Sequence, residues 1–225
     1  MSWYIGVDVG GTFTDFFAVD VETARFVVHK TPSTPGNPAE AILAGLDALS
    51  EREGIPGDAI GRLAHGTTVA TNALIQRRGA PIALITTKGF RDLLEIGRQV
   101  RPKMYDLKAD APPPLVPRQH RFEVAERMNA KGHPLTALQD ADIDAAIDQV
   151  EAAGAEACAV CLLFAFLNPD HEQRIGARLK QRLPNIAISL SSAVQPEFRE
   201  FERFSTTTLN AYLQPIVGRY MRHLG

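Results

Sequence analysis

The sequence predicts a mixed α/β fold in which antiparallel strands come first and helix–strand units follow. Residues 3–7, 15–19 and 25–31 are rich in β-branched and aromatic side chains, as strands are. After residue 38, apolar residues recur at helical spacing between short apolar segments of strand length. The composition, with 45% hydrophobic and 22% charged residues, is typical of a globular protein, and 225 residues suffice for one large domain or two small ones.

A proline-rich connection at 31–38 joins the third strand to the first predicted helix. We expect Asn37 at the N-cap, because its side chain can accept a hydrogen bond from the free amides of the first turn. Pro38 suits the first helical position, where an N–H group is not needed. Gly54 and Pro56 end the helix.

A short strand at 60–64 leads to a second predicted helix, which begins at Thr67 or Thr68 and ends at Gly79. The strand that follows, 81–86, is an almost continuous apolar run. Such a run is expected of a strand that is buried on both faces. A further helical stretch begins after this strand.

Residues 97–138 break the regular order. Prolines cluster there and the apolar periodicity weakens, so we expect an excursion from the core with one strand, at 119–124. Residues 139–225 return to helix–strand order. The predicted elements are a helix at 140–153, a strand at 157–164, a helix at 169–182, a strand at 186–190 and a long helix at 204–224 that bends near Pro215.

This order of elements resembles the ribonuclease-H-like arrangement that actin, hexokinase and the heat-shock chaperone ATPases share. The resemblance implies one lobe of an actin/hexokinase-type ATPase, built on a mixed sheet with antiparallel N-terminal hairpins. In that superfamily the tip of the first hairpin holds phosphate. The first hairpin of this chain is therefore the first candidate for a functional site.

The first hairpin carries a glycine turn. Asp8 lies at the end of the first strand, and Gly10 and Gly11 let the backbone turn back with its amides exposed. Thr12 and Thr14 add hydroxyl groups beside these amides. Concave sets of amides bind anions, and a nearby carboxylate can hold, through water, the divalent metal that accompanies a phosphate. The turn predicts a phosphate and metal site; the alternative is an ordinary hairpin turn.

A histidine follows the strand at 60–64. His65 has the chemistry of a general base near neutral pH, and its alternative role is that of a hydrogen-bonded structural residue. Thr67 and Thr68 either contact substrate or cap the next helix. Asn72, on that helix, is placed to reach the same cleft.

Charged residues follow the strand at 81–86. Lys88, Arg91 and Asp92 come after its end, so we expect them on the same side of the sheet, where the ligands of α/β proteins usually lie. The alternative is the solvated start of a helix. This second reading gives these residues no part in binding.

Two other acidic segments favour a structural role. Asp15 either contacts metal or caps the turn, and it ranks below Asp8 as a metal residue. In the segment 168–172, Asn168 and Pro169 are typical of a helix start, and the acidic residues that follow complement the helix dipole. A metal site there would need more ligands than this segment supplies.

The two cysteines, Cys158 and Cys161, form a C-x-x-C motif inside an apolar run of strand length. Strand positions three apart point to opposite faces, so the two thiols should not share a metal or form a disulfide. No second motif of this kind completes a zinc site. We interpret both residues as small buried hydrophobic side chains.

Five segments, taken together, resemble one family. Their sequences are GVDVGGTFTD at 6–15, HGTTVATNAL at 65–74, TTKGFRD at 86–92, NPDHE at 168–172 and ERFSTT at 202–207. In this order they resemble the N-terminal region of the hydantoinase A / 5-oxoprolinase family, which includes the acetone carboxylase nucleotide-binding subunits. The resemblance covers essentially the whole chain.

The resemblance implies an ATP-dependent hydrolase or carboxylase component with ATP and Mg²⁺ as cofactors. Such an enzyme activates a cyclic amide (hydantoin or oxoproline) or a ketone by phosphorylating its carbonyl oxygen. Asp8 and His65 are then the catalytic candidates, and Arg91 and Asp92 are weaker substrate-binding candidates. The alternatives are a small-molecule kinase of the same superfamily, with a hydroxyl acceptor, and a non-catalytic nucleotide-binding partner subunit.

Members of the family are much longer than 225 residues, and their superfamily clamps ATP between two lobes. We find one glycine turn of this kind, so we expect the second lobe to come from the rest of a longer chain or from another chain. A hydantoinase B-type subunit is an expected partner, and a homo-oligomer is a further expectation. Alone, this lobe should be inactive, because half a site cannot surround the transferring phosphoryl group.

The overall charge favours neither nucleic acid nor membrane as a partner. The formal net charge is −2 and the sequence pI is about 6.3, which gives no basic field. No apolar run is long enough to span a bilayer, and the first residues lack a signal-peptide pattern. We therefore expect a cytoplasmic protein.

Overall fold

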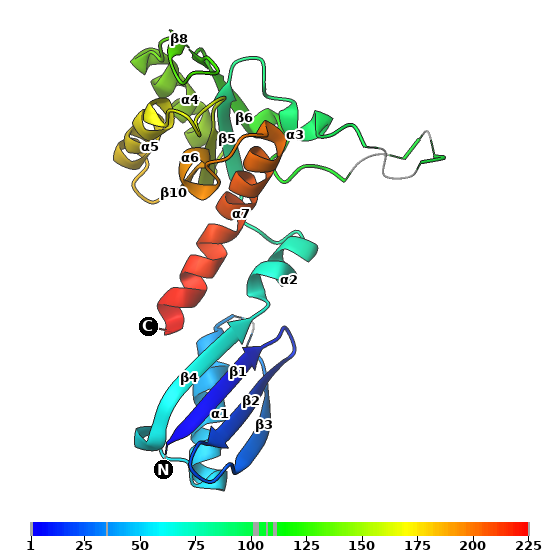
Figure 1. Ribbon diagram of the computed structural model, residues 1–225, viewed down its shortest axis with the longest axis vertical. Helices are drawn as coiled ribbons and strands as arrows, with labels where there is room; N and C mark the ends of the chain where they lie inside the picture. The colour runs from blue at the N-terminus through cyan, green and yellow to red at the C-terminus, as the bar shows by residue number, and fades with distance from the viewer. Residues whose placement is uncertain (1, 35, 101–103, 107, 110–111, 225) are drawn as a thin grey trace. The chain divides into compact units, whose positions relative to one another are not determined.

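The computed structural model describes residues 2–34, 36–100, 104–106, 108–109 and 112–224. Its helices and strands form two compact units (Figure 1). Unit 1 comprises Met1–Gly79 and Ile216–Gly225, and unit 2 comprises Ala80–Pro215. The mixed α/β class is confirmed. Part of the proline-rich segment at 97–138 lies outside the described residues.

Unit 1 is built on a four-stranded sheet with the order β3-β2-β1-β4. The three N-terminal strands are antiparallel, as predicted, and β4 lies parallel to β1, which makes the sheet mixed. The strands are β1 (Trp3–Val9), β2 (Phe13–Asp20), β3 (Phe26–Pro32) and β4 (Ile60–Thr67). Strand β4 is longer than the predicted 60–64, because its pairing with β1 continues until Val9 faces Thr67.

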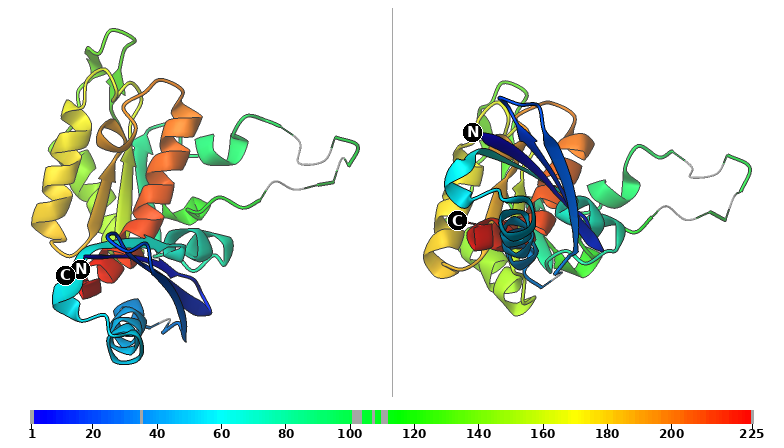
Figure 2. Two further views of the ribbon diagram at one scale, coloured as in Figure 1. Left: turned by 60° about the horizontal axis from the view of Figure 1, so that its bottom comes forward. Right: turned by 90° about the horizontal axis from the view of Figure 1, so that it is seen from below.

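Helix α1 (Pro38–Glu53) covers one face of this sheet (Figure 2). Alternate residues of β1 and β2 are buried beneath the helix, since successive side chains of a strand point to opposite faces. The apolar core of unit 1 consists of Trp3, Ile5, Val7, Val9, Phe16, Ala18, Ile42, Leu49 and Ile55.

The start of α1 differs from the prediction in one respect. Asn37 occupies the N-cap position before Pro38, as expected, but its side chain makes no capping hydrogen bond. The hydroxyl of Thr34 instead accepts the N–H of Ala41 at 3.2 Å. The helix ends as predicted at Gly54, whose φ of 68° is left-handed and suits glycine.

Unit 2 is built on a second four-stranded sheet, with the order β10-β9-β5-β6 and all strands parallel. Every residue of β5 and β9 is buried, which explains their continuous apolar runs. Strand β5 pairs with β6 and β9 and not with β4, so the prediction of a single sheet is wrong. The strands are β5 (Ile82–Thr87), β6 (Arg121–Val124), β9 (Ala157–Cys161) and β10 (Ala187–Leu190).

Helices α4 (Asp140–Ala152) and α5 (Asp170–Arg182) cover one face of the second sheet, and the first part of α7 (Glu200–Leu224) covers the other (Figure 2). Ile143, Ile147 and Val150 of α4 recur at helical spacing and point into the core. Helix α7 begins four residues before the predicted start at 204 and contains Pro215.

The smaller elements are short helices and a two-stranded ribbon. The ribbon lies within the segment 97–138, where only the strand that became β6 was predicted. These elements are η1 (Gly57–Ala59), α2 (Val69–Ile75), α3 (Leu93–Ile96), η2 (Arg118–His120), β7 (Arg127–Met128), β8 (Pro134–Thr136) and α6 (Ser191–Val194).

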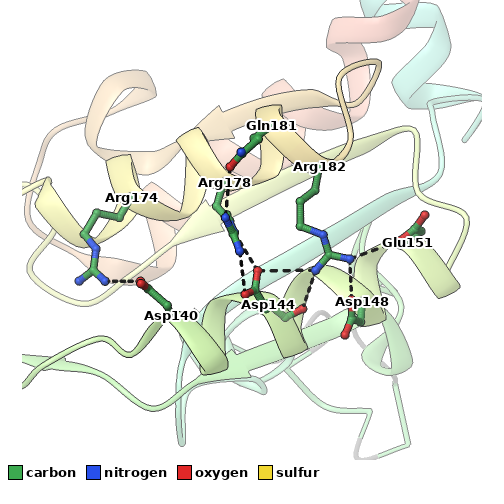
Figure 3. A network of polar contacts seen from close by, with 8 residues as sticks. All are labelled: Asp140, Asp144, Asp148, Glu151, Arg174, Arg178, Gln181 and Arg182. Carbon is green, nitrogen blue, oxygen red and sulfur yellow. Dashed lines mark hydrogen bonds and ion pairs between the residues drawn. The ribbon is translucent and has the colours of Figure 1, made fainter.

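Three arginines of α5 bind acidic side chains of α4 (Figure 3). These ion pairs lie at the surface, where water screens them, so they contribute little to stability but favour one register of the two helices. The pairs are Arg174–Asp140, Arg178–Asp144 and Arg182–Asp148, with N–O distances of 2.7, 2.8 and 2.7 Å.

Both cysteines are buried and free, as predicted. Burial raises the pKa of the Cys158 thiol to about 12, and it also raises that of Cys161 well above its usual value. Among the helices in the described part of the chain, none combines the length and the apolar character needed to cross a membrane.

Candidate functional site

The glycine turn between β1 and β2 is tied to the segment that follows β3. Gly10 donates its N–H to the carbonyl of Phe13 at 3.0 Å, which closes the turn. The hydroxyl of Ser33 donates to the carbonyl of Gly10 at 2.8 Å, and the N–H of Ser33 donates to the carbonyl of Thr12 at 2.9 Å. The turn is therefore held in one position from outside the hairpin.

The turn forms one wall of a pocket of about 330 Å³ that lies entirely within unit 1. Its other walls come from the segment after β3, from α2 and the residues that follow it, and from α7. The pocket is lined by Val9, Gly10, Gly11, Ser33, Thr34, Val69, Asn72, Ala73, Gln76, Arg78 and Ile216.

Polar groups and one positive charge face this pocket. Asn72 lies so close to the turn that a β-carbon at Gly11 would come within 3.5 Å of its Nδ2 atom. The same amide donates to the hydroxyl of Thr68 at 3.1 Å. Arg78 supplies a guanidinium group. The glycine backbone, an amide side chain and an arginine together suit an anion such as phosphate.

The sequence predicted Gly10, Gly11 and Asn72 at this place but not Ser33 or Arg78. Ser33 lies in the proline-rich connection, which only its pairing with the hairpin brings to the turn. Arg78 follows the end of a helix, where an exposed basic residue is common and does not indicate a binding site. No local pattern distinguishes either residue.

The threonines of the turn do not present their hydroxyls as predicted. Thr14 is fully buried and hydrogen-bonded to the hydroxyl of Ser33 at 3.0 Å, so the predicted phosphate contact of Thr14 is wrong. The reason is its register position: Thr14 faces Val9 and points into the core. Thr12 is exposed at the tip and does not line the pocket.

Asp8 lies on the opposite face of the sheet from the buried residues Val7 and Val9. It lines an open hollow of about 500 Å³ together with Asp15 and Gly66, its partners on the two neighbouring strands. The structure therefore places Asp8 and the glycine pocket on different sides of the turn.

The two carboxylates of this hollow differ in their partners. Asp15 forms an ion pair with Lys30 at 3.0 Å. Asp8 is exposed and has no ion pair among the described residues. The part of the chain that the structure describes contains no group of three or more His, Cys, Asp or Glu side chains that could hold a metal ion.

His65 lies inside β4 and not after it, because the strand continues to Thr67. Its Nε2 atom is hydrogen-bonded to the hydroxyl of Tyr220, and the two ring centroids lie 5.4 Å apart. This contact gives one ring nitrogen a partner, as the alternative structural role expects, and the catalytic role of His65 stays a prediction.

Thr67 and Thr68 both have local partners. The hydroxyl of Thr67 accepts the N–H of Val69 at 3.2 Å. Thr68 occupies the N-cap position of α2, and its hydroxyl accepts from Asn72 rather than from the helix backbone. Only Asn72 of the predicted substrate residues in this segment lines the glycine pocket.

Lys88, Arg91 and Asp92 belong to unit 2, because β5 joins the second sheet. The prediction that they line the same sheet as His65 is wrong for this reason. Asp92 accepts two hydrogen bonds from the Arg118 guanidinium, at 2.8 and 3.0 Å. The hydrogen bond from the Arg118 guanidinium lowers the pKa of the Asp92 carboxyl.

The segment 168–172 begins a helix, as predicted. Asn168 Oδ1 accepts the N–H of Asp170 at 3.0 Å, although α5 begins one residue later than expected. His171 and Glu172 are buried in the structure, which the interpretation as a capped helix start did not indicate. A polar pair within an amphipathic helix start carries no sign of such burial.

Glu172 connects the residue that follows β9 with the start of α6. Its carboxylate accepts the N–H of Leu162 at 2.8 Å, the hydroxyl of Ser191 at 2.6 Å and the N–H of Ser192 at 2.8 Å. Burial raises the pKa of Glu172, although these three donors act in the opposite direction.

These features define a class: a mixed α/β protein whose N-terminal hairpin turn borders a pocket suited to an anion. A sequence profile described as the hydantoinase/oxoprolinase N-terminal region matches residues 4–183. The chain belongs to the hydantoinase/oxoprolinase family.

Relatives with curated names support this assignment. Caprolactamase subunit alpha of Pseudomonas jessenii is 37% identical over 226 residues, which cover 98% of this chain and 32% of that protein. 5-oxoprolinase 1 of Arabidopsis thaliana is 33% identical over an alignment 250 residues long, which spans 96% of this chain and 19% of that protein. The chain spans between about a fifth and a third of the length of the curated relatives it matches.

Two solved structures share the fold along the whole chain. The ATP-dependent caprolactamase of P. jessenii matches with a TM-score of 0.86 and 35% identity, over 98% of this chain and 33% of that chain. Acetone carboxylase in its nucleotide-free form matches with a TM-score of 0.82 and 28% identity, over 98% of this chain and 34% of that chain.

Proposed function

We propose that this chain is the nucleotide-binding N-terminal part of an ATP-dependent enzyme that activates a cyclic amide or a ketone. The γ-phosphoryl group of ATP passes to the carbonyl oxygen of the substrate and ADP leaves. Before this step the amide is a poor electrophile and the ketone is a poor enolate precursor. Phosphorylation of the carbonyl oxygen gives either substrate a good leaving group. The substrate class comes from relatives named caprolactamase, 5-oxoprolinase and acetophenone and acetone carboxylase.

The pocket beside the glycine turn is the observation that carries this proposal. Gly10 and Gly11 bring backbone to its wall, Asn72 brings an amide, and Arg78 brings a positive charge. Hydrogen bonds from a charged donor to phosphate are stronger than those between neutral groups. We therefore assign this pocket to the phosphates of the nucleotide, with Arg78 as their cation.

Mg²⁺ is part of the proposal, with Asp8 as its contact through water. The exposed carboxylate of Asp8 fits the oxygen ligands that Mg²⁺ prefers, and this ion usually keeps several of its waters. When bound, Mg²⁺ neutralises charge on the phosphates. Asp8 lies on the other side of the turn from the pocket. In this proposal the terminal phosphates extend past the tip of the hairpin turn, where the Mg²⁺ ion meets Asp8 through water.

We also assign unit 1 to the ribonuclease-H-like fold of actin/hexokinase-type ATPases. The strand order β3-β2-β1-β4, with β1 antiparallel to β2 and parallel to β4, supports this assignment. The second nucleotide-binding lobe then comes from the rest of a longer chain or from a partner. Relatives named as subunits of caprolactamase and of two carboxylases support a partner of the hydantoinase B type.

The test uses the full-length protein with its partner subunit. Phosphate release from ATP is measured with hydantoin, 5-oxoproline, caprolactam and acetone. Asp8→Asn removes the charge but keeps the shape, and we expect it to abolish release. Asp15→Asn is the matched control, because Asp15 already pairs with Lys30, and it should retain activity. Unchanged turnover in Asp8→Asn would remove this carboxylate from the mechanism, and no substrate-dependent release in the wild type would contradict the function.

A further inference from the structure

Ser33 is hydrogen-bonded to both sides of the glycine turn. Its hydroxyl donates to the carbonyl of Gly10 at 2.8 Å, and its N–H donates to the carbonyl of Thr12 at 2.9 Å. Gly10 follows β1 and Thr12 precedes β2, so the two bonds span the turn from one strand to the other. Ser33 itself follows β3, and the turn is therefore held by a residue from outside its own hairpin.

The hydroxyl of Ser33 acts on the turn and not on a ligand. A serine hydroxyl has one hydrogen to donate, and Ser33 gives it to Gly10. The hydroxyl of Thr14, which lies 3.0 Å from Ser33 Oγ, is then the donor in the bond between the two hydroxyls. Although Ser33 lines the glycine pocket, it has no hydrogen left to donate to a phosphate there. Its effect on a phosphate passes through the turn.

The segment that carries Ser33 is itself tied to the rest of unit 1. Thr14, its hydroxyl partner, lies on β2 and is fully buried. The next residue, Thr34, donates its hydroxyl to the carbonyl of Asn37 and accepts the N–H of Ala41 at 3.2 Å. Ser33 is thus anchored to the sheet through Thr14 and to the start of α1 through Thr34.

The bond to Gly10 also sets the direction of the next amide. The carbonyl of Gly10 and the N–H of Gly11 belong to one planar trans peptide, in which the two groups point in opposite directions. Ser33 therefore fixes the direction of the Gly11 N–H as well. This N–H has no acceptor among the described residues, and an amide of this kind is the group that binds a phosphate oxygen.

A turn with two adjacent glycines gains from such a contact. Glycine has no β-carbon, so a free glycine turn samples many backbone conformations. A ligand that binds a mobile turn must order it, and the loss of conformational entropy weakens binding. A turn that the protein already holds in the binding conformation avoids this cost.

We propose that Ser33 is a positioning residue for the phosphates of the nucleotide. Through its bonds to Gly10 and Thr12, it holds the glycine turn in the conformation that binds phosphate. The conformational entropy of the two glycines is then lost on folding and not on binding. The inference rests on the proposed function and adds a residue to its phosphate site.

The test measures ATP binding to the full-length protein by isothermal titration calorimetry. Ser33→Ala removes the hydroxyl, and we expect the dissociation constant for ATP to rise about three- to tenfold, the scale of one hydrogen bond. Ser33→Thr keeps the hydroxyl and should bind ATP within about twofold of the wild type. Ser33→Cys, whose thiol is a weak donor, is the further variant if Ser33→Ala does not fold, and its effect should be smaller.

Urea unfolding of each variant separates positioning from stability. A merely structural role of Ser33 would lower the free energy of unfolding and leave the dissociation constant of the folded protein unchanged. Thr23→Ala is the matched control, because the Thr23 hydroxyl also ties a turn of this sheet, by donating to Asp20 at 2.7 Å. That turn joins β2 to β3, at the end of β2 that lies away from the glycine turn. We expect Thr23→Ala to bind ATP within about twofold of the wild type.

Three results would overturn the inference alone, in a wild type that binds ATP. They are unchanged affinity in Ser33→Ala, equal weakening in Ser33→Ala and Ser33→Thr, and equal weakening in Ser33→Ala and Thr23→Ala. The second result would mean that the hydroxyl has no role, and the third that any loosening of the sheet has the same effect. A wild type that binds no ATP contradicts the proposed function, and the inference with it.

Discussion

Phe16 occupies the space that a side chain at Gly45 would need: a β-carbon built on Gly45 would overlap the ring of Phe16. Phe16 lies on β2 and is 1% exposed, and Gly45 lies in the middle of α1. The absence of a side chain at Gly45 therefore lets the helix approach the sheet closely. Helix α1 follows Ser33 and Thr34 in the chain, and both of these residues line the glycine pocket.

We expect Gly45→Ala to destabilise unit 1. Alanine is favoured over glycine inside a helix by about 1 kcal/mol. Overpacking of a filled core costs about 1–3 kcal/mol, which outweighs that gain because the added carbon would overlap the Phe16 ring, which is buried. Urea unfolding, followed by circular dichroism, measures the change in free energy.

The matched control is Gly218→Ala, in α7, where the added carbon would meet the nearest atom of Arg222 at an ordinary 3.6 Å. This change should stabilise the protein or leave it unaffected. Equal effects at Gly45 and Gly218 would mean that the Phe16 ring moves aside without cost, and the close approach would then have no role in stability.

Local features of the fold were predictable from the sequence, and the site only in part. The three antiparallel strands and the glycine turn follow from side-chain alternation and from two adjacent glycines, which are local properties. Thr14 shows the limit of this reasoning. Its hydroxyl was expected at the turn, but the pairing of Val9 with Thr14 turns it into the core.

The errors concern partners that lie far apart in the sequence. An apolar strand such as β5 looks the same whichever sheet it joins, so its pairing with β6 and β9 was not predictable. The contact between His65 and Tyr220 joins residues 155 positions apart, and that between Glu126 and His171 joins residues 45 positions apart. Neither pair forms a pattern within a window of sequence, so only the folded chain shows them.

We expect Arg78→Gln to weaken ATP binding by about tenfold or more, because a hydrogen bond between a charged group and phosphate contributes about 1.5–3 kcal/mol. The effect should fall on binding and not on stability, since Arg78 is exposed at the rim of the pocket. Isothermal titration calorimetry of the full-length protein with ATP measures the dissociation constant.

Arg77→Gln is the control for charge, because Arg77 is adjacent but does not line the pocket. It should change the dissociation constant for ATP less than twofold, a threshold set at about 0.4 kcal/mol of binding free energy. If the two variants weaken ATP binding equally, the positive charge acts at a distance, and the result contradicts the proposed direct contact of Arg78 with phosphate.

Glu172 predicts a pH dependence of stability. Burial raises its pKa in the folded protein above the value of 4.5 typical of an exposed glutamate. The folded state therefore favours the protonated form of Glu172. The contribution of this group to the free energy of unfolding is complete below about pH 4.5, and it is lost as the pH rises through the pKa of the folded state. Glu172→Gln does not titrate. Urea unfolding between about pH 4.5 and pH 8 should show the variant gaining stability relative to the wild type as the pH rises.

A constant difference between the two proteins over that range would contradict the raised pKa of Glu172. The three donors around the carboxylate would then outweigh its burial, and the group would stay ionised throughout. Asp144→Asn in α4 serves as the control of opposite sign, because the hydrogen bond from Arg178 lowers the pKa of Asp144. That variant should lose stability relative to the wild type as the pH rises from the acidic range.

Cys158 and Cys161 should be unreactive in the folded chain. Only the thiolate attacks a disulfide reagent, and burial raises the pKa of Cys158 to about 12, so almost none is present near neutral pH. Both side chains are also closed to solvent, since Cys158 and Cys161 are 0% exposed. With Ellman's reagent at about pH 8, we expect no release of thionitrobenzoate from the native protein and release from both thiols in guanidinium. Rapid reaction of either thiol in the native state would mean that β9 opens to solvent, and the second sheet would not be the closed core that its burial indicates.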